Sequence, residues 1–150
     1  ISAYIDWCEN VNAPRIAVYS GSFNPFHVGH LDILRKAENM FDKVIVQIGK
    51  NLEKSGDLTS RVAAIEKVLP NNQVIVYDGL LADLEKHLGY PITIVKGIRN
   101  EDDLKFENVT EDYNPDVKMC FIVGDRKFEH VSSSSIKQLA NFAQVENYIP

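Results

Sequence analysis

The sequence predicts an α/β domain in which helices cover both faces of a parallel sheet. Short Val- and Ile-rich runs alternate with amphipathic stretches along the 150-residue chain. The apolar runs are nearly continuous in hydrophobicity, which is typical of strands that are covered on both faces. Because strands and helices alternate, we expect a single doubly wound domain whose ligands bind beyond the carboxyl ends of the strands.

Five strands are predicted by these apolar runs, at residues 16–19, 44–48, 74–77, 92–95 and 117–123. Helices are predicted for residues 29–41, 59–69, 80–88, 101–109 and about 132–142. The first helix has the apolar spacing of a helix that lies on a sheet, and Pro70 ends the second. This order of elements predicts a Rossmann-like domain with a five-stranded parallel sheet.

The composition is that of an ordinary soluble globular protein. The chain is 45% hydrophobic and 25% charged, and no apolar run approaches the ~20 residues of a membrane span. The formal net charge of −5 argues against nucleic acid as the main partner, because such binding depends on basic surface. No signal peptide is visible, and Cys8 and Cys120 form no disulfide framework or metal-ligand spacing. We therefore expect a cytoplasmic protein without a membrane partner, with Cys120 in its core.

Residues 1–14 fall outside the alternation of strands and helices. Their apolar residues have the spacing of a short amphipathic helix, and residues 10–14 are predicted to form a linker. We interpret the stretch as an N-terminal extension or linker that precedes the domain.

Residues 20–30, SGSFNPFHVGH, are the most informative stretch of the chain. They join a predicted strand to a predicted helix, so a glycine-containing turn leads into a helix that begins with His27 and His30. Backbone N–H groups and the positive end of a helix converge at such a turn and stabilise an anion. A single histidine there is usually a cap or a surface residue, but two that flank a glycine favour a binding site. The chain contains neither a P-loop nor a dinucleotide fingerprint, so a different kind of phosphate site is indicated.

Cations and hydroxyl groups follow other predicted strands at the same edge of the sheet. Two lysines, Lys54 among them, lie in a polar loop after the second strand, although a charged loop is usually only solvated. Lys96 and Arg99 flank Gly97 after the fourth strand, and both cations suit phosphate oxygens. A serine run at 132–135 follows the fifth strand and could both cap a helix and bind a phosphate. No carboxylate pair, serine–histidine–aspartate set or cysteine–histidine set accompanies them, which favours phosphoryl or nucleotidyl transfer by charge stabilisation.

These motifs resemble the nucleotidyltransferase superfamily with the H/T-x-G-H signature, and within it phosphopantetheine adenylyltransferase most closely. In chain order the resemblance rests on GSFNPFHVGH, Lys54, DGLL at 78–81, VKGIR at 95–99, DLKFE at 103–107 and VSSS at 131–134. It runs nearly collinearly over residues 15–150, about nine-tenths of the chain. The resemblance implies a nucleotidyltransferase domain at 15–150 that transfers an adenylyl group from ATP to 4′-phosphopantetheine, in coenzyme A biosynthesis.

The resemblance implies catalytic roles for His30, Lys54 and Arg99. His30 would contact the α-phosphate and stabilise the transition state, while Lys54 and Arg99 would neutralise charge on the attacking phosphate and the triphosphate. The implied reaction is in-line attack by a phosphomonoester oxygen on the α-phosphorus of ATP, with pyrophosphate as the leaving group. Magnesium would enter as Mg-ATP, and the resemblance implies no protein residue as a metal ligand.

The resemblance also implies two sets of binding residues. Ser22 would hydrogen-bond the attacking phosphate, His27 would bind the β- or γ-phosphate, and Lys96 with Leu81 would hold the pantetheine arm. The expected acceptor-binding residues are Ser22, Lys54, Leu80, Leu81 and Lys96. The expected ATP-binding residues are Gly21, Ser22, Phe23, His27, His30, Gly97, Arg99, Glu107, Ser132, Ser133 and Ser134.

The chain departs from the family pattern at Lys96, where arginine is usual, and in two shortened segments, 50–59 and 108–114. An adenylyltransferase for another phosphomonoester, such as nicotinamide mononucleotide, therefore stays open as an alternative, since GSFNP with His27 suits that branch. A non-catalytic nucleotide-binding module of the same fold is a second alternative. A cytidylyltransferase is less favoured, because that branch carries an I-S-T-T-type motif. A homo-oligomer is expected, the hexamer being usual in the family.

Overall fold

The computed structural model describes residues 13–23, 25–49, 58–99, 117–128 and 149–150. Its strands are β1 (Ile16–Gly21), β2 (Lys43–Gly49), β3 (Val74–Tyr77), β4 (Thr93–Ile98) and β5 (Met119–Val123). Its helices are α2 (Val28–Met40), α3 (Leu58–Val68), α4 (Leu81–Leu88) and the short 3-10 helix η1 (Arg126–Phe128). All five predicted strands are confirmed, together with the first three predicted helices. The helices predicted at 101–109 and about 132–142, and the proposed N-terminal helix, lie outside the described residues.

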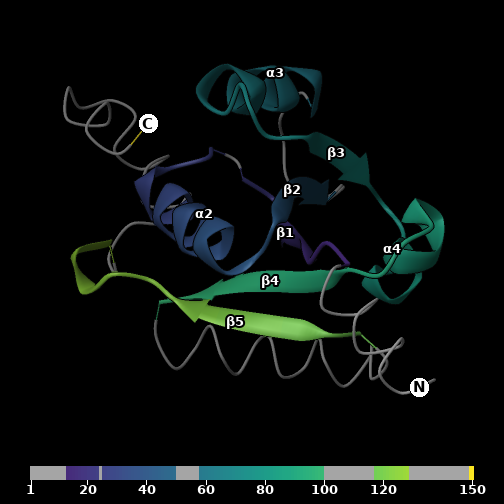
Figure 1. The fold of residues 1–150 in the computed structure, drawn as a ribbon. Helices are drawn as coiled ribbons and strands as arrows, with labels where there is room; N and C mark the ends of the chain where they lie inside the picture. Colours follow the sequence, from purple (N-terminus) through teal and green to yellow (C-terminus); the bar gives the residue numbers. More distant parts are fainter. Residues whose placement is uncertain (1–12, 24, 50–57, 100–116, 129–148) are drawn as a thin grey trace.

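The five strands form one parallel sheet in the order β3-β2-β1-β4-β5 (Figure 1). From β1 the chain moves outward to β2 and β3, and then returns to the other side of β1 for β4 and β5. Strand order therefore reverses between β1 and β4, which confirms the doubly wound Rossmann-like fold. In sheets of this kind the ligand crevice opens at the carboxyl ends of the two strands where the order reverses.

Helices pack on both faces of this sheet. On one face, Leu34 of α2 and Ile65 of α3 join a core with Val46 and other inward-facing strand residues. On the opposite face, Leu84 of α4 packs with Ile45 and other strand residues in a second core. Successive residues of a strand point to opposite faces, so each apolar run supplies both cores, as the continuous hydrophobicity predicts.

The fourth strand is longer than predicted, and the correction matters for the site. Pairing with β5 continues through Lys96, Gly97 and Ile98, so Lys96 and Gly97 lie inside the strand rather than in a turn after it. A Cβ at Gly97 would lie 2.9 Å from Cγ1 of Ile33, a residue of α2. Glycine is therefore required there by the close approach of α2 to β4, and not by a turn.

Cys120 lies in β5, as predicted, and is half-buried against the core that contains α2. Within the described segments, no helix is long and apolar enough to cross a membrane.

Candidate active site

The motif at residues 20–30 lies where the strand order reverses. β1 ends at Gly21, and the chain then turns and enters α2 at Val28. Lys96 and Arg99 lie at the carboxyl end of the adjacent strand, β4. The topology therefore brings the two motifs to one edge, as the sequence predicts.

His27 and His30 cap the start of α2 reciprocally. His27 is the N-cap residue, and its Nδ1 accepts the backbone N–H of His30 at 3.3 Å. In return, Nδ1 of His30 accepts the backbone N–H of His27 at 3.1 Å. This is the geometry of a capping box, with imidazoles in place of the usual hydroxyl and carboxyl groups. The two rings stack, with their centroids 3.6 Å apart and their planes inclined by 18°.

Aromatic rings surround the His30 imidazole. The ring of Phe23 meets it edge-on at a centroid distance of 4.8 Å, and that of Phe26 lies 5.3 Å away. Phe23 is 1% exposed and has a φ of 46°, a left-handed conformation that residues other than glycine rarely adopt. Backbone strain of this kind persists only where the surrounding structure enforces it, and it is concentrated at functional sites.

Two glycines of the motif lie where a side chain would be tightly packed. A Cβ at Gly29 would lie 3.0 Å from Cε1 of His27, so a side chain there would press on the stacked imidazole. A Cβ at Gly21 would lie 3.0 Å from the ring of Phe23. The glycine between the two histidines thus leaves room for the ring pair.

Both histidines are held neutral. Burial, and after it the nearby Arg99 guanidinium, lowers the pKa of His27 to about 4. The pKa of His30 is lowered well below its usual value by burial first, and then by His27 and Arg99. Because each Nδ1 accepts a backbone N–H, each neutral ring carries its proton on Nε2, which is a donor for a ligand.

The same edge presents further N–H donors and positive charge. The N–H groups of Val28 and Gly29 belong to the first turn of α2, so they have no carbonyl partner within the helix. Arg99 is exposed, and its charge acts on both histidines. Neutral imidazoles, helix N–H groups and a guanidinium form a site that stabilises negative charge.

The other predicted site residues divide into those the structure describes and those it does not. Gly21 is the last residue of β1, and Ser22 and Phe23 belong to the turn that follows it. Leu80 is 67% exposed and Leu81 half-buried at the start of α4, which follows β3. The positions that lie outside the described residues are Lys54, Glu107, Ser132, Ser133 and Ser134.

Sequence reasoning missed two buried polar residues at this edge. Arg61 of α3 is 8% exposed, and its Nη1 donates to the carbonyl oxygen of Ser22 at 3.3 Å. Its spacing of four from the buried Ile65 could have indicated that it faces inward. Gln47 of β2 is 2% exposed and lies within an otherwise apolar strand, an interruption that signals a specific partner.

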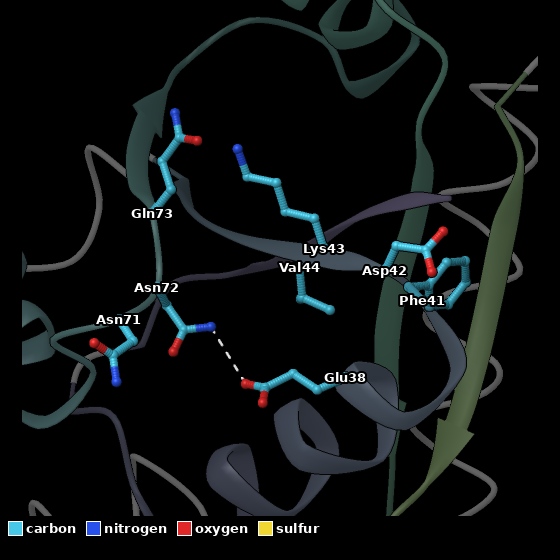
Figure 2. A pocket seen from close by; sticks show the side chains of 8 residues that line it. All are labelled: Glu38, Phe41, Asp42, Lys43, Val44, Asn71, Asn72 and Gln73. Carbon is cyan, nitrogen blue, oxygen red and sulfur yellow. Dashed lines mark hydrogen bonds between the residues drawn. The ribbon is translucent and has the colours of Figure 1, made fainter. Parts of the chain in front are cut away.

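A separate depression of about 290 Å³ lies at the start of β2 and β3, at the opposite end of these strands (Figure 2). Polar side chains line it, and Asn72 Nδ2 donates to Glu38 Oε1 at 3.3 Å across it. Glu38 also pairs with Arg35, at 3.0 Å. None of the predicted site residues lines this depression, and its polar groups join the loop before β3 to α2.

Relatives with known names match most of the chain. A family model described as cytidylyltransferase-like matches residues 18–148. A phosphopantetheine adenylyltransferase of Levilactobacillus brevis is 40% identical over 136 residues, covering 85% of this chain and 84% of the relative. A phosphopantetheine adenylyltransferase of Clostridium botulinum is 36% identical over 146 residues and covers 91% of each chain.

Solved structures share the fold at low identity. The Plasmodium falciparum nicotinic acid mononucleotide adenylyltransferase complexed with NaAD matches with a TM-score of 0.66 and 17% identity over 91% of each chain. A bifunctional NMN adenylyltransferase/ADP ribose pyrophosphatase from Francisella tularensis matches with a TM-score of 0.62 and 19% identity, covering 91% of this chain and 44% of that one. At these identities the likeness establishes the Rossmann-like fold only. The sequence relatives go further, and by their identity and coverage this chain belongs to the phosphopantetheine adenylyltransferase family of cytidylyltransferase-like proteins.

Proposed function

We propose that this protein transfers the adenylyl group of ATP to 4′-phosphopantetheine, giving dephospho-coenzyme A and pyrophosphate. The observation that carries the proposal is the reciprocally capped, neutral pair of His27 and His30 at the N-terminus of α2, beside Arg99. Family membership supplies the substrate pair, because the relatives at 35–40% identity are named phosphopantetheine adenylyltransferases.

The chemistry requires stabilisation of charge on phosphate rather than a protein nucleophile. A phosphate oxygen of the acceptor attacks the α-phosphorus of ATP, and the bond from that phosphorus to the oxygen bridging to the β-phosphate breaks. We assign His30 Nε2–H and the first-turn N–H groups of α2 to the α-phosphate oxygens, where negative charge accumulates. A neutral imidazole with Nδ1 already occupied acts there as a hydrogen-bond donor, and it transfers no proton.

Arg99 and Lys54 complete this assignment as cations. The Arg99 guanidinium would bind phosphate oxygens through two parallel N–H groups. Lys54 is assigned to the attacking phosphate on the resemblance, as are Glu107 and Ser132–Ser134 to the ATP side. Arg61 supports the site indirectly, since its bond to the Ser22 carbonyl oxygen holds the turn that binds phosphate.

Magnesium is proposed to enter with ATP. Within the described segments, no group of three or more His, Cys, Asp or Glu could hold a metal ion. The residues that gather at the candidate site are N–H donors and cations, which do not suit a hard cation that prefers oxygen ligands. On this proposal Mg²⁺ would enter as part of the substrate complex Mg-ATP and would be held by the phosphate oxygens.

On the acceptor side, Ser22 would bind the phosphate, Leu80 and Leu81 would contact the pantetheine arm, and Lys96 would provide a second cation. Lys96 is half-buried on β4, one strand away from the turn that contains Ser22. An ammonium group binds phosphate as a point charge, whereas the arginine usual in the family binds through two N–H groups. We therefore expect 4′-phosphopantetheine to be the acceptor, bound with lower affinity than an arginine at this position would give.

The test of the substrate is pyrophosphate release from Mg-ATP with 4′-phosphopantetheine, with nicotinamide mononucleotide, or with no acceptor. We expect release with 4′-phosphopantetheine only. Release with nicotinamide mononucleotide instead would identify the protein as an adenylyltransferase for that nucleotide, the alternative that GSFNP and His27 suggest. If no pyrophosphate is released with any acceptor although the protein binds ATP, the non-catalytic alternative is favoured.

The test of the catalytic assignment is His30→Ala. We expect a loss in kcat on the order of 10²-fold or more, the scale for removing one preorganised charge-stabilising group. His87→Ala removes an exposed histidine from α4 and serves as the matched control. Transfer by His30→Ala at the wild-type rate would refute the role of the histidine pair.

We also propose a cytoplasmic homo-oligomer, on the basis of the cysteine usage and the family resemblance. Light scattering coupled to size-exclusion chromatography would test the assembly. A mass six times that of the 16.9 kDa chain is the result expected from the hexamer usual in the family.

A further inference from the structure

A single buried amide links three strands at the candidate site. Ser20 of β1 donates its hydroxyl hydrogen to Oε1 of Gln47 on β2. Nε2 of Gln47 donates in turn to the carbonyl oxygen of Tyr77, the last residue of β3, at 2.9 Å. Gln47 is 2% exposed and Ser20 is 8% exposed, so both polar groups are withdrawn from water. An apolar side chain would fill this buried position without needing hydrogen-bond partners. The presence of an amide there therefore requires an explanation.

The position of the bridge supplies that explanation. Ser20 and Gln47 are paired in the sheet and lie on the face of α4, each two residues beyond a core residue of that face. The two hydrogen bonds thus cross the sheet at its carboxyl edge. Ser20 immediately precedes Gly21 and Ser22, the turn assigned to the acceptor phosphate. Tyr77 immediately precedes residues 78–81. This segment contains Leu80 and Leu81, which are assigned to the pantetheine arm.

We infer that Gln47 is a positioning residue that sets the separation of these two acceptor-binding segments, and through it the affinity for 4′-phosphopantetheine. The inference rests on the proposed function, because it needs an acceptor that contacts both segments at once. The amide is bonded at both ends and buried, so it ties the carboxyl ends of β1 and β3 together in addition to the backbone pairing of each strand with β2. A long acceptor with a phosphate at one end binds well only when both segments are at the right distance.

The effect should be larger on acceptor binding than on ATP binding. His27 and His30 lie at the start of α2, which packs on the opposite face of the sheet from α4. Loss of the bridge therefore leaves the groups assigned to the α-phosphate in place. For Gln47→Leu, which removes both hydrogen bonds of the bridge, we expect the KM for 4′-phosphopantetheine to rise about tenfold. The KM for Mg-ATP should rise less than the acceptor KM, since only Gly21, Ser22 and Phe23 of the expected ATP-binding residues follow the bridge, and kcat should change by less than about twofold.

Two further variants separate positioning from simple destabilisation. Ile45→Val shortens a fully buried side chain on the same strand and the same face, two residues from Gln47. It should lower Tm while leaving both KM values within about twofold of the wild type. Ser20→Ala removes one end of the bridge and leaves Gln47 bonded to Tyr77, so we expect a smaller rise in acceptor KM, about threefold. If Gln47→Leu does not fold, Ser20→Ala decides the question.

The outcomes distinguish this inference from the proposed function. A wild-type protein that transfers no adenylyl group to 4′-phosphopantetheine would overturn both. An active wild type with an unchanged acceptor KM in Gln47→Leu, or in Ser20→Ala where the first variant does not fold, would overturn the positioning role alone. Equal changes in both KM values and in kcat would assign the amide to stability of the fold.

Discussion

The neutral histidine pair makes a quantitative prediction about stability and pH. His27 has a folded-state pKa of about 4, against 6.5 for an ordinary histidine, because it is buried and close to Arg99. Between these two pH values the unfolded chain binds a proton at this position and the folded chain does not. The free energy of unfolding therefore rises with pH across this window, and it falls as the solution is acidified.

The size of the effect follows from the width of the window. Each pH unit is worth about 1.4 kcal/mol, so the window from 6.5 down to about 4 gives about 3 kcal/mol. Roughly 2.5 kcal/mol of this falls between pH 7 and pH 4.5. The perturbation we choose is His27→Ser, because serine is a favoured N-cap residue and does not titrate in this range. The variant loses the stacked ring and should be less stable by about 2 kcal/mol at pH 7.

The assay is urea unfolding of wild type and variant at half-unit steps from pH 7 to pH 4.5. The wild type should lose about 2.5 kcal/mol more than His27→Ser over this range, so the two curves converge on acidification and cross near its acidic end. His87→Ser controls for the loss of a histidine as such. Parallel curves for wild type and His27→Ser would refute the conclusion that folding holds His27 neutral.

Three substitutions test the close packing and the charge of the site. Gly29→Ala should lower stability by about 1 kcal/mol, and reduce kcat, because its Cβ would lie 3.0 Å from the buried His27 ring. An increase in Tm, which helix propensity alone would give, is the contrary result. Gly97→Ala should cost about 1–3 kcal/mol in urea unfolding, since its Cβ would lie 2.9 Å from the buried Ile33 side chain; an unchanged midpoint would contradict this. Lys96→Arg should lower the KM for 4′-phosphopantetheine about fivefold through bidentate binding, and a higher KM would show that this cation does not meet a phosphate.

Much of the sheet could be predicted because its signal is local. The continuous apolar runs identified all five strands, and β3 (Val74–Tyr77) has the predicted bounds. The predicted end of β4 was wrong by three residues, because Lys96 and Gly97 have the composition of a polar turn. In the folded protein, pairing with β5 continues through both residues, and this pairing depends on a segment more than 20 positions away.

The residues of the candidate site also divide into those that local sequence predicted and those that it did not. His27 and His30 were predicted from their spacing at a strand-to-helix junction, and the structure confirms that both lie at the start of α2. Their reciprocal hydrogen bonds and their stacking are also local, but they depend on the conformation of the turn. Gln47 and Arg61 were not predicted, because each bonds to a residue 27 to 39 positions distant in the chain.

The sequence by itself determined the class of fold, the edge of the sheet at which the candidate site lies, and the chemical character of the groups there. These follow from periodicity, from turn residues and from side-chain types, all of which act over a few neighbouring positions. Only the tertiary structure decided that both imidazoles are neutral and carry their proton on Nε2, and that one buried amide links β1, β2 and β3. Burial and hydrogen bonding between strands arise from packing of distant segments, and no local pattern specifies the partner that each buried polar group meets.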